Sequence, residues 1–423
     1  MMIPYGYKQT EVGVIPEDWD VRKIGDFTDI TAGGTPSTSH PEYWNGEILW
    51  MSSGELNNRR IHNVIGRITE LGYNNSSTHM IPKNCVLIGL AGQGKTRGTV
   101  AVNYVELCTN QSIAAIFPSK EHNSEYLYQN LRSRYAELRE LSSGDGGRGG
   151  LNLTIIKNFP CAFPKLQEQN RIAEALSDVD GMISSLEKLI AKYKSIKTAC
   201  LQQMFPQNGE TVPRMRLPGF TDAWEQRKLG DISEIKTGPF GSTLHADDYV
   251  SDGTPIITTE HFKTGALPRS KNGLPQVSDS DYKRLTAYTL DDGDIVFSRV
   301  GSVDINALIT PFQSNWLFSG RVLRVRPQTD ISSKFLHTRL ETESIKTDIR
   351  TRAVGQTMPS INTEILKITP LVLPSSAAEQ EQIGSYFAAL DNFITLHQRK
   401  LEKLQKIKQG MMQQLLTGKI RLM

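Results

Sequence analysis

Residues 19–26 read WDVRKIGD, and the same pattern returns at residues 224–231 as WEQRKLGD, 205 positions further along the chain. The match continues beyond these segments, with Ile30 corresponding to Ile235. Self-similarity at a fixed spacing is typical of chains built from repeated structural units. The sequence therefore predicts two units of the same kind, one in each half of the 423 residues.

The repeat is strongest in the last third of each half, where the offset grows to 211. Residues 168–172 read EQNRI and correspond to EQEQI at residues 379–383, and Asp180 corresponds to Asp391. Small insertions in surface loops account for the change of offset. We interpret each half as a globular domain followed by a helix.

The globular parts combine short β-branched runs with short helical segments. The runs at residues 86–90, 99–102 and 294–298 are bounded by turn residues, as strands are. Residues 124–141 and 332–350 have helical patterns. This mixture predicts an α+β fold for each domain. We place the first globular domain at residues 1–165, a central helix at 166–206, a second globular domain at 207–374 and a second long helix with a tail at 375–423.

Heptad spacing predicts that both long helices bury one seam, because their apolar residues follow each other at alternating steps of four and three. The positions are Ile172, Leu176, Val179, Ile183, Leu186, Ile190 and Tyr193 in the first helix, and Ile383, Phe387, Leu390, Ile394, His397, Leu401 and Leu404 in the second. Both patterns then change phase, to Ile196 and Cys200 in one helix and to Ile407 and Met411 in the other, which predicts a shared stutter. An amphipathic helix on one domain core is the alternative. Seven heptad positions within 22 residues exceed what such packing needs. We therefore expect the two helices to pack together.

Residues 89–96 read GLAGQGKT and match the P-loop pattern in full, after a strand-like run. A phosphate site of this kind needs a helix to begin at the lysine, so that its amide groups hold the phosphates. Here residues 97–102 read RGTVAV, which is typical of a second strand. The equivalent residues 298–302 read SRVGS and have no lysine-threonine pair. We predict a β-hairpin tip, and a P-loop NTPase is the alternative function.

A glycine-rich tip with basic and amide side chains suits a nucleic-acid groove, where Lys and Arg neutralise phosphate and Arg or Gln reach base edges. The glycine-rich loops before the long helices have the same character. Arg321, Arg324 and Arg326 are expected to share one face of a strand. Solvated loops or a solvated sheet face are the alternative interpretation. The candidate DNA contacts are Gln93, Lys95, Thr96, Arg97, Arg148, Asn152, Arg299, Ser302, Arg321, Arg352 and Gln356.

The composition points to no catalytic or metal site. The 48 basic and 45 acidic residues leave a net charge of +3, so any phosphate-binding face must be local. The four cysteines form no C-x-x-C pair, and the eight histidines form no H-E-x-x-H pattern. Because no run of eighteen apolar residues and no signal-like start occur, we expect a cytoplasmic protein.

Taken together, the duplicated Trp-led segment, the Glu-Gln helix starts and the sequence QQLLTGK at residues 413–419 resemble the specificity subunit of a type I restriction-modification system. The resemblance covers essentially the whole chain. It implies two target-recognition domains of unlike sequence, joined by two similar long helices that pack antiparallel. With the internal repeat, this suggests a pseudo-two-fold arrangement.

The resemblance also implies that the chain has no catalysis of its own. Its partners would be double-stranded DNA, two DNA adenine methyltransferase subunits and restriction/translocase subunits. S-adenosylmethionine, ATP and magnesium would bind only to those partner subunits, so no cofactor is expected here. The sequence agrees, because it has no Pro-Pro dipeptide and hence no N-P-P-[FY] methylase motif. The expected target is bipartite and asymmetric, and a coiled-coil adaptor that binds only proteins is a second alternative.

Overall fold

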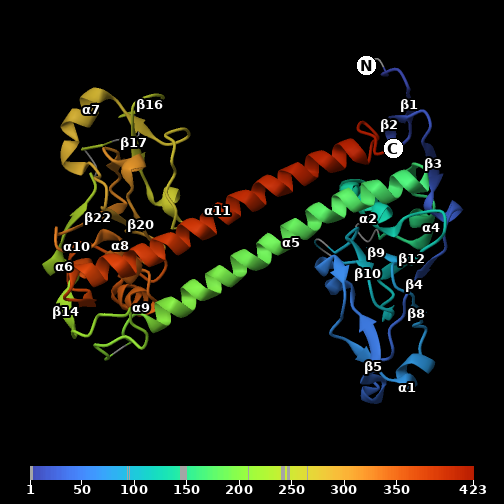
Figure 1. Cartoon of the computed structure of the whole chain (residues 1–423), viewed down its shortest axis with the longest axis horizontal. Coiled ribbons are helices and arrows are strands. Elements are labelled where there is room, and N and C mark those ends of the chain that lie inside the picture. The colour runs from blue at the N-terminus through green and yellow to red at the C-terminus, as the bar shows by residue number, and fades with distance from the viewer. Residues whose placement is uncertain are drawn as a thin grey trace. The chain divides into compact units, whose positions relative to one another are not determined.

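The computed structural model describes residues 3–92, 94, 96–142, 150–207, 209–239, 243–244, 248–263 and 265–423. The chain divides into two compact units. Unit 1 contains Met1–Glu187 together with Arg399–Met423, and unit 2 contains Lys188–Gln398. Each unit therefore includes the end of one long helix and the beginning of the other (Figure 1).

The described strands of unit 1 form two main sheets and two smaller pairs. The five-stranded sheet has the order β4 (Ile30–Ala32), β12 (Ile113–Ile116), β9 (Val86–Gly89), β10 (Val100–Asn103) and β6 (Arg60–Ile61). The four-stranded sheet has the order β7 (Arg67–Ile68), β5 (Trp44–Met51), β11 (Leu107–Thr109) and β8 (Met80–Ile81). The pairs are β1 (Tyr7–Thr10) with β2 (Gly13–Pro16), and β3 (Asp20–Lys23) with β13 (Pro160–Phe163).

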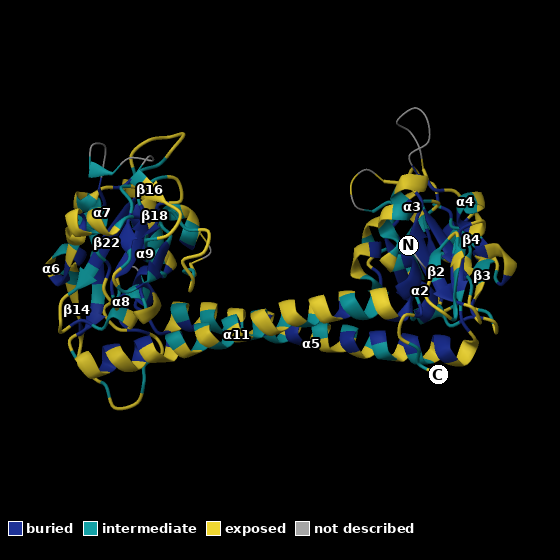
Figure 2. Ribbon diagram, turned by 90° about the horizontal axis from the view of Figure 1, so that it is seen from above, coloured by how far each residue is buried: buried dark blue, intermediate teal, exposed yellow. Residues whose placement is uncertain are grey.

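The described short helices of unit 1 are α1 (Glu70–Asn74), α2 (Ser124–Ser133), α3 (Tyr135–Leu141) and α4 (Leu153–Lys157), with 3-10 turns η1 (Ile24–Asp26), η2 (Pro41–Tyr43) and η3 (Ser53–Asn58). Alternation along β9 explains how they pack, since successive side chains of a strand point to opposite faces. Val86 and Ile88 enter the core formed with α2. Leu87 enters a second core on the other side of the sheet. The central sheet is thus buried on both faces (Figure 2).

Unit 2 repeats this plan. Its described strands form one sheet in the order β15 (Ser233–Thr237), β22 (Val322–Pro327), β19 (Ile295–Ser298) and β20 (Asn306–Leu308), a second in the order β16 (Tyr249–Val250), β18 (Gln276–Val277), β17 (Thr254–Ile257) and β21 (Leu317–Phe318), and the pair β14 (Trp224–Lys228) with β23 (Pro370–Pro374). Its helices are α6 (Leu229–Ile232), α7 (Asp279–Arg284), α8 (Ser333–Leu340), α9 (Glu343–Arg352) and α10 (Thr363–Lys367), with 3-10 turns η6 (Thr259–Phe262), η7 (Thr286–Tyr288) and η8 (Pro311–Gln313). On β19, Ile295 and Phe297 face the core shared with α8, and Val296 faces the other side. The predicted α+β fold and its internal repeat are confirmed.

The long helices are α5 (Leu166–Gln203) and α11 (Ala377–Leu415). Within unit 1 they run antiparallel, since Ile172 and Leu176 pack in one cluster with Leu415 and Leu416, while Asp180 reaches back to Lys408. Gly418, with φ +68°, turns the chain just after α11, and a Cβ at that position would lie 2.5 Å from Pro16 Cδ. None of the described helices is long and apolar enough to cross a membrane.

Two helix predictions need correction. Residues 124–141 do not form one helix, because the backbone leaves the helical region at Arg134, with φ −104° and ψ 26°, and α3 begins anew. The segment at 332–350 is likewise divided, because α8 ends at Leu340 and α9 begins at Glu343. Helical periodicity continues through the first break, from Leu131 to Leu138, so the pattern alone does not locate it.

Candidate nucleic-acid interface and helix junctions

The P-loop-like segment forms the connection of a β-hairpin, as predicted. Strands β9 and β10 pair antiparallel, with Ile88 opposite Val100, and the amide of Gly98 donates to the carbonyl of Gly89 at 2.9 Å. A strand follows this loop where a nucleotide site would need a helix. Gln93 and Lys95 lie outside the described residues. Thr96 and Arg97 are half-buried, and the buried Nε of Arg97 has no hydrogen-bond partner among the described residues.

In unit 2 the structure brings several candidates together. The amide of Arg299 donates to the carbonyl of Arg321 at 3.0 Å, and that of Gly301 to the carbonyl of Pro359 at 2.8 Å. Ser302 is exposed beside them. Gln356 is exposed in the loop that the bridge between residues 354 and 360 closes. The connection after β19, the turn before β22 and the loop before α10 therefore lie side by side in unit 2.

Other candidates have structural roles. Asn152 is the N-cap of α4, where its Oδ1 accepts from the amide of Ile155 at 2.9 Å, and Asn362 caps α10 in the same way. Such caps satisfy amides that the first helical turn leaves unpaired. Arg352 is exposed but donates twice to Asp348, which raises the pKa of its guanidinium. Arg148 lies outside the described residues.

The expectation that three arginines share one strand face is wrong for Arg321. It precedes β22 in an exposed turn, and an odd separation from Arg324 would place it on the opposite face in any case. Arg324 is only 3% exposed and pairs with Glu234 at 2.7 Å. Arg326 binds both oxygens of Asp294 at 2.7 and 2.8 Å. Arg324 and Arg326 therefore hold the sheet together, and only Arg321 is presented to solvent.

The start of each long helix is joined to its unit by a Trp-Glu-Arg contact, which we call a helix junction. In junction 1, Glu168 accepts from Trp19 Nε1 at 3.0 Å, and Arg421 Nε and Nη2 donate to its two oxygens at 2.7 and 2.9 Å. Junction 2 is formed by Trp224, Glu379 and Arg216 in the same arrangement, with distances of 3.4, 2.7 and 2.8 Å. Both carboxylates are buried. The repeated Trp and Glu are thus framework residues.

The glutamine that follows each of these glutamates ties three elements together. Gln169 Nε2 donates to the carbonyl of Pro164, and its Oε1 accepts from the amide of Asn123, the N-cap of α2, both at 2.9 Å. In unit 2, Gln380 makes the same two bonds to Pro374 and Ser332 at 2.9 and 3.0 Å. The sequence predicted that the Glu-Gln pairs start the helices but did not predict these contacts.

The predicted stutter is wrong for α11, where the heptad phase continues through a buried lysine, whereas in α5 the stutter position Ile196 is half-buried and packs against the core cluster that contains Cys200. Lys408 is 4% exposed and pairs with Asp180, whereas Ile407 is 43% exposed. Lys197 occupies the equivalent position in α5 and binds Asp391 at 2.7 Å. Because the predicted seam was defined by apolar residues alone, it did not include Lys197 and Lys408. The heptad residues assigned from sequence are buried at Ile172, Leu176, Val179, Leu186, Ile190, Ile383, Phe387 and Ile394, and half-buried at Ile183, Tyr193, Leu390, Leu401 and Leu404.

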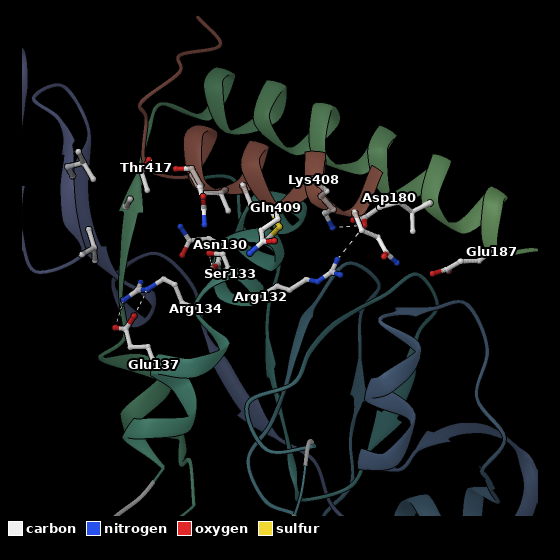
Figure 3. Close-up of a pocket in the computed structure, with 18 residues that line it drawn as sticks. Asn130, Arg132, Ser133, Arg134, Glu137, Asp180, Glu187, Lys408, Gln409 and Thr417 are labelled. Carbon is white, nitrogen blue, oxygen red and sulfur yellow. Dashed lines mark hydrogen bonds and ion pairs between the residues drawn. The ribbon is translucent and has the colours of Figure 1, made fainter. Parts of the chain in front are cut away.

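A cavity of about 670 Å³ lies in unit 1 beside the pair Asp180–Lys408. Arg132, Ser133 and Arg134 of the α2–α3 region face Lys408 and Gln409 of α11 across it (Figure 3). Arg134 is held by Glu137 and by the carbonyl of Pro160, so the cationic side chains around the cavity are paired within the unit.

In the described part of the chain, no cluster of His, Cys, Asp or Glu has the geometry of a metal site. The four cysteines are buried and free, and burial raises the pKa of Cys85 to about 12.

Comparison with known proteins gives one consistent result. The family model described as type I restriction modification DNA specificity domain matches twice, at residues 16–196 and 221–406. The chain is similar to the type I restriction enzyme MjaIX specificity subunit of Methanocaldococcus jannaschii, with 26% identity over 98% of this chain and 96% of the relative. It is also similar to the MjaVIII specificity subunit of the same organism, with 23% identity over 96% and 94%. Its fold is similar to the crystal structure of a type I restriction-modification S subunit from M. genitalium, with a TM-score of 0.65 and 16% identity over 94% of this chain and 96% of that one.

Proposed function

Because the chain belongs to the type I restriction modification DNA specificity family, we propose that it reads a bipartite, asymmetric DNA target and holds methyltransferase and restriction subunits on it. Each unit reads one short block of bases. The two blocks differ because the loops of the two units differ. A fixed number of unread bases separates them.

The observation that carries this proposal is the contrast between a repeated framework and unlike loops. The sheet order β4-β12-β9-β10 of unit 1 has its counterpart in β15-β22-β19-β20 of unit 2, and the junctions and Glu-Gln contacts recur. The connections between the paired strands do not recur. They read LAGQGKTRGT in unit 1 and RVGSVDI in unit 2. A protein that needs two different readings on one scaffold varies such connections, because base contacts are made by a few side chains.

The proposed base contacts come from these connections and from the loops before α4 and α10. In unit 2 the strongest candidates are Ser302, Arg321 and Gln356, which are exposed on the segments that lie side by side. Arginine and glutamine can both form bidentate bonds to base edges. In unit 1 the proposal keeps Gln93, Lys95 and Arg148, together with Thr96 and Arg97.

We also propose that the chain is non-catalytic and binds no cofactor of its own. Methyl transfer, with S-adenosylmethionine, and ATP-driven cleavage, with magnesium, belong to two methyltransferase subunits and to restriction subunits. Family membership supports this division, and so does the strand that follows the P-loop-like segment. A nucleotide-binding assay on the isolated chain tests the NTPase alternative.

The decisive experiment replaces residues 221–370 with the matching segment of a related subunit and sequences the methylome of cells that carry the hybrid. We expect one block of the methylated sequence to change, while the other block and the spacer are kept. Well-separated base contacts contribute nearly additively, so the unexchanged unit has no physical reason to change its preference. A target altered in both blocks, or in neither, would contradict the division of recognition between the units. The absence of a salt-dependent DNA affinity would instead favour the protein-only adaptor.

A further inference from the structure

Each unit holds an Asp–Lys pair between the two long helices, and of the four side chains Lys408 is buried and the others are half-buried. In unit 1 the aspartate is on α5 and the lysine on α11, as Asp180 and Lys408. In unit 2 the roles are exchanged, with Lys197 on α5 and Asp391 on α11. Along each helix the lysine follows the aspartate by seventeen residues. The repeat therefore supplies the same pair of charges to both units.

A third charged group reaches each pair from the globular part of the unit, and its sign differs. In unit 1 it is Arg132, whose Nη1 lies 3.4 Å from Asp180 Oδ1. In unit 2 it is Glu341, whose Oε2 lies 2.8 Å from Lys197 Nζ. The two positions are equivalent, because each lies nine residues after an N-cap, Asn123 or Ser332, whose amide binds the glutamine at the helix start.

The surroundings of the third group also differ between the two units. In unit 1, Arg60 also binds Asp180 at 3.2 Å, Gln129 donates to it at 2.8 Å, and the ring of Tyr128 faces both guanidinium groups. An aromatic face attracts cations. In unit 2 the residue equivalent to Tyr128 is His337, which lies beside Glu341 and bonds to Asn306 through Nδ1 at 2.7 Å.

The charge of the third group also affects the pKa values of the two lysines. Burial, together with Arg132 and Arg60, lowers the pKa of Lys408 to about 8, although Asp180 opposes the change. Burial lowers the pKa of Lys197 as well, but Glu341 and Asp391 outweigh it, and the net shift is upward. A buried ion pair stays stable only if nearby groups satisfy it. The two pairs meet that condition with third groups of opposite sign.

We propose that the Asp–Lys pair is a docking socket for exchangeable recognition domains, which accepts either a basic or an acidic side chain nine residues after the N-cap of the docking helix. A basic side chain binds the aspartate, as Arg132 does, and an acidic one binds the lysine, as Glu341 does. The partner is thus a recognition domain of this same family with either charge at that position. This inference rests on the proposed function, since it explains how one pair of helices can hold domains of unlike sequence.

The test compares charge reversal with charge removal in the full-length chain. Arg132→Glu and Arg132→Met are made with Lys408 present and again with Lys408→Met, and the melting temperature of each is measured by calorimetry. With Lys408 present, we expect Arg132→Glu to be at least as stable as Arg132→Met, because its carboxylate can bind the lysine. With Lys408→Met, we expect Arg132→Glu to melt about 3 °C or more below Arg132→Met. An insoluble product counts as the lower stability.

Unit 2 provides the mirrored comparison with Glu341→Arg and Glu341→Met, with and without Asp391→Asn. If reversal is less stable than removal even when Lys408 or Asp391 is present, the pair accepts only one sign and the socket is disproved. The methylome of cells with Arg132→Glu separates this result from the proposed function. An unchanged target with a reversed stability order overturns the socket alone, whereas an unmodified chain that directs no methylation overturns the proposed function and leaves the melting comparison valid.

Discussion

The two helix junctions use the same three residue types but take their arginines from different places in the chain. In junction 1, Arg421 follows α11 and binds the carboxylate at the start of α5. In junction 2, Arg216 follows α5 and binds the carboxylate at the start of α11. Each long helix is therefore anchored by the segment that follows the other one. The comparison teaches that the junctions close the repeat differently: junction 2 lies within the second half of the sequence, whereas junction 1 joins the first half to the segment after α11.

Removing the junction carboxylate should have the largest effect on stability. Glu379→Ala removes the carboxylate that accepts from Arg216 and from the indole of Trp224. Glu168→Ala removes the one that accepts from Arg421 and Trp19, although Arg421 keeps its two hydrogen bonds to Asp18 at 2.8 Å. Removing one partner of a buried ion pair lowers the free energy of unfolding by about 3–5 kcal/mol. Urea unfolding of both variants measures this cost.

The matched control for the junctions is Glu381→Ala, two residues further along α11. Its carboxylate is half-exposed and pairs with Lys334 at 2.9 Å, so we expect a loss below about 1 kcal/mol. Equal losses at Glu168 and Glu379 would support equivalent junctions. A large loss at only one of them would show that the second anchor depends on other contacts.

The helix seam should show the next largest effect. Ile190→Asp places a carboxylate at a buried heptad position, at a cost of about 2–4 kcal/mol. Leu401→Asp should cost less, because Leu401 is only half-buried. Thermal unfolding checks the order, and Met182→Asp, at an exposed position of α5, is the control. A normal melting temperature for Ile190→Asp would mean that the helices do not pack through this seam.

The two lysines of the Asp–Lys pairs should respond to pH in opposite ways. The pKa of Lys408 in the folded protein lies near 8, below its ordinary value of 10.5, so the unfolded state binds more protons between these values. The free energy of unfolding should therefore rise between about pH 8 and pH 10.5, relative to Lys408→Met, by about 1–3 kcal/mol.

For Lys197 the sign is reversed. Its pKa is raised, so its stabilisation is present below pH 10.5 and is lost as the pH rises above that value. The measurement is urea unfolding of the unmodified chain, Lys408→Met and Lys197→Met at a series of pH values. Parallel curves for the two variants would contradict the different surroundings of the two pairs.

The smallest effects should come from the exposed loops. Gln356→Ala or Arg321→Ala should change the preference for a base in one block only, by about 1–3 kcal/mol, without changing the melting temperature. Lys95→Ala should weaken DNA binding about equally for all sequences and lower the salt slope by about one. Titration of DNA at several salt concentrations gives both values. Loss of ATP affinity in the assembled complex with Lys95→Ala would restore the P-loop alternative.

The spacing of apolar residues and the internal repeat were sufficient to predict the two long helices, the hairpin whose tip is the P-loop-like segment, and the α+β class. They were insufficient wherever a polar residue has a tertiary partner. The lysines at heptad positions were missed because the seam was defined by apolar residues, although Lys197 and Lys408 share the 211-residue offset of Asp180 and Asp391. That shared offset is the signal that could have found them.

The candidate loop residues show the same limit. Asn152 is of a residue type suited to base contacts, but in the structure it caps a helix. Arg324 is buried in an ion pair. Which role a polar side chain takes depends on partners distant in the chain, such as Glu234 for Arg324, and a local pattern contains no information about them. The prediction that Arg321 shares a strand face with Arg324 was wrong for a simpler reason, because the two residues are separated by an odd number of positions.

Unit 1 combines residues 1–187 with residues 399–423, and this sets the order in which the two units can be completed during synthesis. Its core and junction need residues 399–423, which contribute Leu415, Leu416 and Arg421. A ribosome adds about 5–20 residues per second, so roughly 10–40 s pass between residues 187 and 399. The part of the protein that is made first is therefore completed last, after all of unit 2 has been synthesised. Until residue 421 has been added, Glu168 lacks the arginine that binds it in junction 1. A chain released before that point cannot complete unit 1.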